Sequence, residues 1–162
     1  ALGVDMIWLG DDVGSQRGMI MSPDMWRSVL KPRLAEFIHT LKEINPEVKA
    51  AYHSCGNIVP IVGDLVDIGL DVLNPIQPAC MNPGHLKDAY GDRLCFWGSI
   101  DVQKTLPFGS PEDVRKEVED RIRVLGRDGG LILGPTHHVQ LDTPMENFRA
   151  MIDAITGEGK RP

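Results

Sequence analysis

The sequence predicts an α/β fold in which helices join parallel strands, and two observations support this prediction. Short apolar runs alternate with amphipathic stretches along nearly all of the 162 residues. A group of polar residues follows the end of each apolar run. Because consecutive parallel strands need a crossover connection, which a helix supplies, this alternation predicts a sheet or barrel built from βα units.

Five short, mainly apolar runs are typical of strands that are buried on both faces. The predicted strands cover residues 4–9, 49–53, 71–74, 94–97 and 130–133. Each is separated from the next by a stretch long enough for at least one helix. The sequence therefore predicts five βα units.

Three of the expected helices begin with the same local signal, a hydroxyl residue followed directly by proline. These signals are Ser22-Pro23, Ser110-Pro111 and Thr143-Pro144. The hydroxyl is expected to cap the helix, and the proline to occupy its first position. Pro32 is expected to kink the first helix. Two shorter helices are expected to begin at Asn57 and Asn82.

Composition and charge exclude several classes of partner. The fractions of hydrophobic (42%) and charged (25%) residues are ordinary for one soluble domain. A formal net charge of -6 without a dense basic cluster makes neither nucleic acid nor an anionic membrane an expected partner. The chain has no apolar run long enough to span a membrane and no basic secretory signal at its start. We therefore expect a cytoplasmic protein that acts on a small molecule.

Polar residues after the predicted strands are expected to form one site, because ligands of α/β folds bind at the carboxyl ends of the strands. The candidates are Asp12, Gln16, His53, Cys55, Gln77, Asp101, His137 and Gln140. Three other residues of these groups, Asn57, Ser99 and Thr143, are expected to act only as helix caps or turn residues.

His53 and Cys55 carry the sharpest chemical signal. They lie two residues apart at a strand end, so both side chains can point to one face, and imidazole and thiolate are common zinc ligands. A lone His-x-Cys also arises where a buried cysteine lies by chance beside a hydrogen-bonded histidine. The helix start expected at Gly56-Asn57 would lower the pKa of the Cys55 thiol. His137 or His138 could supply a third ligand, and His137 is the candidate chosen.

The other two cysteines are less informative. An odd total of three cysteines cannot form a complete disulfide framework and suits a reducing compartment. Cys95 lies inside an apolar run and is expected to pack in the core. Cys80 follows the third strand, where a metal ligand, a reactive thiol and a residue with neither role are all possible.

Five segments together resemble the uroporphyrinogen decarboxylase superfamily. They are residues 11–16 (DDVGSQ), 53–57 (HSCGN), 73–78 (LNPIQP), 96–101 (FWGSID) and 136–140 (THHVQ) with 143–147 (TPMEN). The resemblance runs through nearly the whole chain. It is closer to the corrinoid-linked, zinc-dependent methyltransferases of this superfamily than to its decarboxylases, because a His-x-Cys followed far downstream by another ligand marks that branch.

The resemblance implies a (β/α)8 TIM barrel, which needs about 250 residues. Five predicted units then make residues 1–156 the C-terminal portion of such a barrel, followed by a flexible tail over residues 157–162. The first and last strands would be open hydrogen-bonding edges. We therefore expect this chain to form a homo-oligomer or to pair with the remainder of the barrel. The chain is then either part of a longer protein or a natural short protein that closes its barrel with a second copy.

The resemblance also implies a Zn²⁺ cofactor and a reaction. His53 and Cys55 match the two adjacent zinc ligands of the methyltransferase branch, and His137 falls where those enzymes generally carry a cysteine ligand. The implied activity is methyl transfer between a methylated substrate or methylcobamide and a thiol or corrinoid acceptor. A corrinoid is thus expected either as a substrate or as the cofactor of a partner protein.

The remaining roles are assigned by position at the strand ends. Asp12 and Asp101 are the catalytic candidates that would handle protons, and Gln16, Gln77 and Gln140 are the candidates for substrate binding. All five follow predicted strands, at the edge where the site is expected.

Two alternative functions stay open. The first is a cofactor-free decarboxylase acting on a tetrapyrrole with acetate side chains, in which Asp12 and His137 contact the substrate. Such a polyanion needs arginines, and Arg17 is the only arginine in the five polar groups. The second is an inactive partial barrel that serves as a binding or assembly module.

Overall fold

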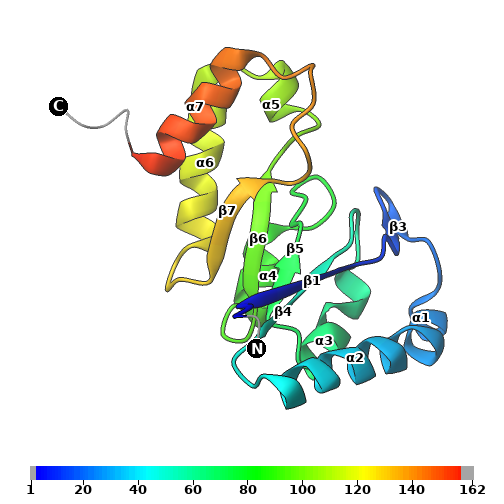
Figure 1. Cartoon of the computed structure of the whole chain (residues 1–162). Coiled ribbons are helices and arrows are strands. Elements are labelled where there is room, and N and C mark those ends of the chain that lie inside the picture. The colour runs from blue at the N-terminus through cyan, green and yellow to red at the C-terminus, as the bar shows by residue number, and fades with distance from the viewer. Residues whose placement is uncertain (1–2, 158–162) are drawn as a thin grey trace.

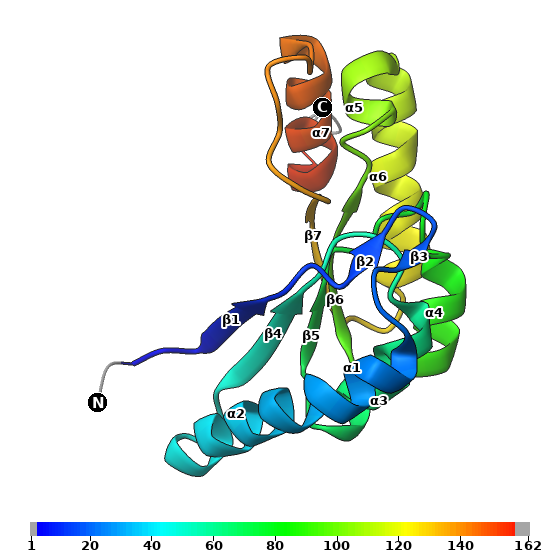
Figure 2. The same cartoon turned by 90° about the vertical axis from the view of Figure 1, so that its right-hand side faces the viewer.

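The computed structural model describes residues 3–157 as a curved, five-stranded parallel sheet with helices along one face (Figures 1 and 2). The strands are β1 (Met6–Gly10), β4 (Lys49–His53), β5 (Val72–Asn74), β6 (Cys95–Ile100) and β7 (Leu131–Pro135). They lie side by side in this order, each parallel to the next. The predicted α/β class and all five predicted strands are confirmed.

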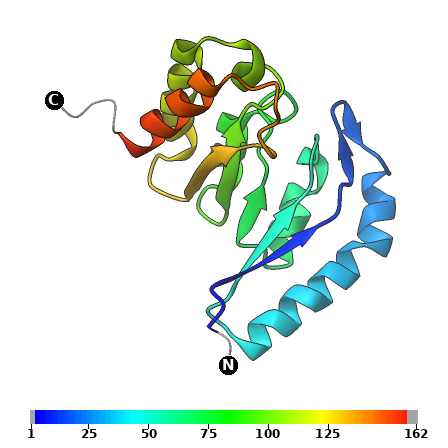
Figure 3. The ribbon, with the colours of Figure 1, turned by 45° about the horizontal axis from the view of Figure 1, so that its top comes forward.

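Each strand is followed by at least one helix, as in successive units of a βα barrel (Figure 3). The helices are α1 (Pro23–Val29), α2 (Lys31–Ile44), α3 (Val59–Asp67), α4 (Pro83–Tyr90), α5 (Thr105–Phe108), α6 (Pro111–Leu125) and α7 (Met145–Thr156). A short hairpin of β2 (Gly14–Ser15) and β3 (Gly18–Met19) precedes α1 and was not predicted. In the described part of the chain, β1 and β7 are the two edges of the five-stranded sheet.

Two predicted helix caps are confirmed at proline-containing helix starts. Ser22 Oγ accepts a hydrogen bond from Met25 N at 3.1 Å, and Ser110 forms a reciprocal capping box with Asp113. At the third signal the prediction is wrong, because α7 begins after Pro144 without a side-chain cap. Helix α7 therefore has Pro144 as its N-cap residue, and Thr143 does not cap it.

Other local predictions needed correction. The helix expected to kink at Pro32 is in fact two helices that meet at Leu30, with Pro32 in the first turn of α2, where a missing N–H is tolerated. Asn82 caps α4, but α3 begins at Val59, two residues later than expected. Ser99, expected as a cap or turn residue, is buried inside β6 with φ +86°.

The alternation of side chains along β4 decides which residues face the helices. Ala50 and Tyr52 belong to the main core between the sheet and α1 to α4. Ala51 and His53 therefore point to the opposite face, the concave face of the sheet. A second, smaller core joins the end of β6 to α5, α6 and α7.

Two further observations concern the ends and the surface of the molecule. Gly157, with φ +72°, ends α7, and residues 158–162 of the expected tail lie outside the described residues. None of the described helices is long and apolar enough to cross a membrane.

Candidate metal centre at the carboxyl ends of the strands

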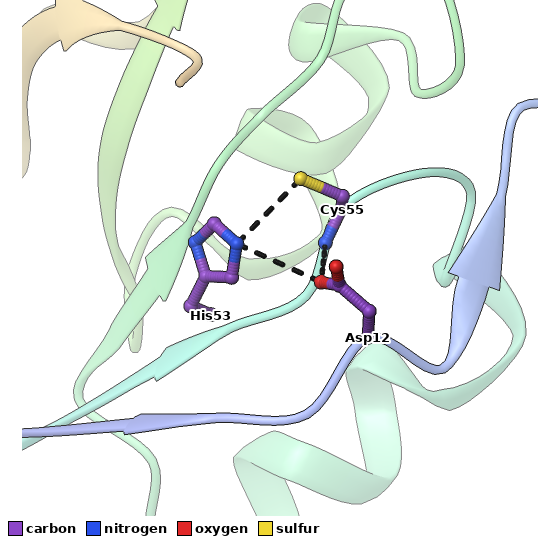
Figure 4. Close-up of side chains that lie close together, drawn as sticks. All are labelled: Asp12, His53 and Cys55. Carbon is purple, nitrogen blue, oxygen red and sulfur yellow. Dashed lines mark hydrogen bonds and ion pairs between the residues drawn. The ribbon is translucent and has the colours of Figure 1, made fainter. Parts of the chain in front are cut away.

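Asp12, His53 and Cys55 come together at the carboxyl ends of β1 and β4 (Figure 4). Each offers one metal-ligating atom, and these three atoms lie within 4.8 Å of one another. His53 Nε2 is 3.6 Å from Asp12 Oδ1 and 3.5 Å from Cys55 Sγ. The histidine side chain is 19% exposed and the aspartate 59%, so the group is anchored in the sheet and open on one side.

The register between β1 and β4 brings Asp12 to this position. Gly10 lies opposite His53 in the parallel ladder, and Asp11 N donates to the His53 carbonyl at 3.1 Å. The next residue, Asp12, then reaches across to accept a hydrogen bond from Cys55 N at 2.8 Å. Two neighbouring strands thus place all three side chains.

Two glycines allow the β2–β3 hairpin and the loop carrying Cys55 to touch backbone to backbone. A Cβ on Gly14 would lie 2.5 Å from the Cys55 carbonyl oxygen, and a Cβ on Gly56, whose φ is +81°, would lie 2.5 Å from the Ser15 carbonyl oxygen. Asn57 N donates to that Ser15 oxygen at 2.8 Å. Larger residues at either glycine would separate the two loops.

Two buried polar side chains hold this loop from below. Ser54 Oγ accepts a hydrogen bond from Val13 N at 3.1 Å, which ties the loop to the segment after β1. Gln77 Oε1 accepts a hydrogen bond from Gly56 N. Gln77 was predicted to bind substrate, but the structure buries it against the backbone of the loop, a geometry that supports a positioning role.

The Cys55 thiol is not activated by its local environment. Burial raises its pKa, and the Asp12 carboxylate and Cys80 raise it further. The predicted lowering by a helix N-terminus is wrong, because α3 begins only at Val59. A bound divalent cation would favour the thiolate over the thiol.

His137, the predicted third ligand, lies across a cavity from His53. The two ring centroids are 6.3 Å apart, and the His137 and His138 rings meet edge to face at 5.0 Å. The structure thus places Asp12, and not His137, in the compact group with His53 and Cys55.

A cavity of about 500 Å³ on the concave face opens beside His53. It is lined by Trp8, His53, Asn74, Trp97, Pro135, Thr136, His137, His138 and Val139. Trp8 stacks on His53 with centroids 5.6 Å apart and meets Trp97 edge to face at 4.5 Å. The two tryptophans were not predicted as site residues, and Asn74, at the end of the third predicted strand, was given no role. Strand alternation could have found Trp8, which shares a face with Gly10, the residue opposite His53.

The remaining predicted residues make other contacts. Gln16 Oε1 accepts a hydrogen bond from the Cys80 thiol at 2.9 Å, and Gln140 Nε2 donates to the His138 carbonyl at 3.3 Å. Both glutamines are exposed. Asp101 is buried and lines a second cavity, of about 420 Å³, between the loop after β5 and helices α5 and α6.

Hydrogen bonds hold Asp101 within its own loop. Its Oδ1 accepts from Gln103 N at 2.7 Å, while its backbone N–H donates to Glu117 Oε1 at 3.1 Å. The structure therefore does not bring Asp101 together with Asp12, His53 and Cys55.

The parallel sheet with alternating helices defines the class of protein, an α/β fold that matches part of a βα barrel, and the candidate group lies at the carboxyl ends of its strands. The chain belongs to the uroporphyrinogen decarboxylase (URO-D) family, whose family model matches residues 1–157. This confirms the resemblance seen in the sequence. A solved methyltransferase from Methanosarcina mazei is similar in structure and sequence, with a TM-score of 0.73 and 28% identity over 97% of this chain and 43% of that one.

Curated relatives fall into two kinds of enzyme. The methylcobamide:CoM methyltransferase MtaA of Methanosarcina barkeri is 28% identical over 94% of this chain and 41% of its own length. The methylated-thiol–coenzyme M methyltransferase of Methanosarcina mazei is 27% identical over 95% of this chain and 38% of its own length. The uroporphyrinogen decarboxylase of Psychromonas ingrahamii is 23% identical over 91% of this chain and 44% of its own length. The chain spans about two fifths of the length of these relatives.

Proposed function

We propose that this chain carries the metal centre of a zinc-dependent methyltransferase, with Asp12, His53 and Cys55 as ligands. The observation that carries the proposal is the convergence of an imidazole nitrogen, a carboxylate oxygen and a sulfur atom within 4.8 Å. Zinc takes this mixture of ligands, and a site with three protein ligands leaves one position open for chemistry.

The distances in the group fit a zinc ion. Tetrahedral coordination with bonds of about 2.0–2.3 Å separates ligand atoms by about 3.5 Å. The two separations from His53 Nε2, 3.6 Å to Asp12 Oδ1 and 3.5 Å to Cys55 Sγ, agree with this value. A thiolate and a carboxylate together carry two negative charges, which balance a divalent cation.

Each side chain of the site has a distinct part in the proposed reaction. When bound, zinc supplies a Lewis acid that deprotonates a thiol or polarises the group that carries the methyl. His53 and His137 both line the cavity, and we propose that His137 contacts the substrate there. We further propose that the exposed Gln16 and Gln140 contact substrate at the rim.

The methyltransferase relatives support the choice of reaction. One is named for methylcobamide and CoM, the other for a methylated thiol and coenzyme M. By analogy we propose a corrinoid as substrate or as the cofactor of a partner protein, and a thiol as the other reactant. The reducing environment that the free cysteines suit agrees with a cytoplasmic location.

Porphyrinogen decarboxylation is the second candidate, because several relatives are uroporphyrinogen decarboxylases. Its substrate carries several carboxylates, which need cationic partners. The described residues that line the cavity beside His53 include neither arginine nor lysine. This lining favours methyl transfer over decarboxylation.

Zinc content tests the proposal directly. Elemental analysis after dialysis against a weak chelator should find close to one zinc per chain in the wild type and almost none in Cys55→Ala. Cys95→Ala, which removes another half-buried thiol from β6, is the matched control and should keep its zinc. A folded wild-type protein without zinc would overturn the proposed centre and leave a decarboxylase or an inactive binding module, which turnover of a porphyrinogen would tell apart.

A further inference from the structure

Asn74 links His53 to the neighbouring strand and takes no part in the ligand group. Its side chain is only 5% exposed and lies at the end of β5, between His53 on β4 and Trp97 on β6. Asn74 Oδ1 is 2.6 Å from His53 Nδ1, and Asn74 Nδ2 donates to the Trp97 carbonyl oxygen at 3.1 Å. These two hydrogen bonds connect three consecutive strands.

The Trp97 carbonyl is available because the ladder between β5 and β6 has ended there. The last pair in that ladder joins Leu73 to Phe96. One residue further along each strand, the side chain of Asn74 takes the place of a backbone donor. The amide is thus part of the sheet and not a mobile surface group.

The orientation of the amide follows from this geometry. A carbonyl oxygen only accepts hydrogen bonds, so the Trp97 oxygen must face the NH₂ group of Asn74. The reverse orientation would set two oxygens 3.1 Å apart. The amide oxygen of Asn74 therefore faces His53 Nδ1. Because this oxygen also only accepts hydrogen bonds, Nδ1 must carry the hydrogen.

We propose that Asn74 is a positioning residue that holds His53 in the Nδ1–H tautomer and fixes the plane of its ring. In this tautomer Nε2 keeps its lone pair, and Nε2 is the atom that lies 3.6 Å from Asp12 and 3.5 Å from Cys55. Trp8, stacked on the same ring, restricts its rotation. The functional meaning of this role rests on the proposed function, because outer-shell partners of this kind orient metal-ligating histidines.

The tautomer can be measured without any metal. The ¹⁵N chemical shifts of the two His53 ring nitrogens, measured in the metal-free full chain at about pH 8.5, show which nitrogen carries the hydrogen. We expect the Nδ1–H form in the wild type and a mixture of both forms in Asn74→Leu. Asn74→Asp keeps an acceptor oxygen toward His53 but loses the hydrogen bond to the Trp97 carbonyl, so it should keep the Nδ1–H form at a lower stability.

Asn147→Leu is the matched control for the loss of a buried amide. Asn147 is 1% exposed, and its Nδ2 donates to the carbonyls of Leu106 and Gly109 in the second core. This variant should lose stability but keep the wild-type tautomer of His53. Zinc affinity should fall about 10–100-fold in Asn74→Leu and less in Asn74→Asp.

Several outcomes would overturn the inference. The Nε2–H form in the wild type would do so without any variant, and so would the same tautomer in the wild type and in a folded Asn74→Leu. If the tautomer changes as expected while no form of the protein binds zinc, the positioning role is supported and the proposed function fails.

Discussion

Replacing Gly56 with alanine tests whether backbone contact between the β2–β3 hairpin and the loop of Cys55 builds the candidate centre. Gly56 has φ +81°, and an alanine Cβ there would lie 2.5 Å from the Ser15 carbonyl oxygen and 2.6 Å from Ser15 N. Real Cβ atoms essentially never come within 3.0 Å of such atoms. The hairpin and the loop must therefore move apart.

The structure contains a control that separates the two causes of strain. Gly129 has φ +84°, almost the same as Gly56, but nothing lies within 4 Å of its Cβ position. Gly129→Ala should therefore cost only the left-handed backbone penalty, about 1–2 kcal/mol. Gly56→Ala adds the loss of the hydrogen bonds from Asn57 N to Ser15 and from Gly56 N to Gln77, at about 1 kcal/mol each. We expect a total of about 3–4 kcal/mol for Gly56→Ala.

Urea unfolding followed by tryptophan fluorescence measures both losses, and zinc content measures the effect on the site. Gly56→Ala should be the less stable of the two variants and should lose zinc, whereas Gly129→Ala should keep it. Equal free energies of unfolding and equal zinc contents in the two alanine variants would refute the argument that this close contact builds the centre.

Three further predictions concern the ligand group, an ion pair and the sheet edges. In a competition titration, Asp12→Ala should lower zinc affinity at least as much as the loss of an outer-shell partner does, about 10-fold or more. His137→Ala should leave the zinc content unchanged. The reverse result would make His137 the third ligand. Burial raises the pKa of Asp64, but hydrogen bonds and charge from Lys31 and Arg27 outweigh it and lower the pKa overall. The stability that Asp64 contributes is thus fully present above its unfolded pKa of about 3.9 and is lost as the pH falls through the lower folded value. The difference in unfolding free energy between wild type and Asp64→Asn should therefore be constant near neutral pH and disappear in acid. A difference that persists in acid would argue against this ion pair. Because β1 and β7 are edge strands of the described sheet, light scattering should find oligomers or aggregates of the isolated chain, and a monodisperse monomer would contradict this.

The strands of the fold were predictable from the sequence because a strong apolar pattern marks each of them. The five strands are apolar runs between polar groups, and the pattern identified all of them. The hairpin was missed because each of its strands has only two residues, and α5 because it has only four. Whether Pro32 bends a helix or lies at the start of a new one depends on how α1 and α2 pack, and the local sequence does not determine this packing.

The site was predictable only where its residues are close in sequence. His53 and Cys55 could be paired because strand alternation relates them directly. The contact of Asp12 with both depends on the register between β1 and β4, and the 6.3 Å between His53 and His137 depends on the curvature of the sheet. The hydrogen bond from Asn74 to Trp97 arises only because the ladder between β5 and β6 ends one residue earlier.

All three proposed ligands come from two adjacent strand ends, within residues 12–55, while His137 and His138 come from the far edge of the sheet. The proposed ligands and the two histidines that face them across the cavity therefore lie on different strands of the described sheet. Substitutions in the loop after β7 can change what approaches the centre without disturbing its ligands.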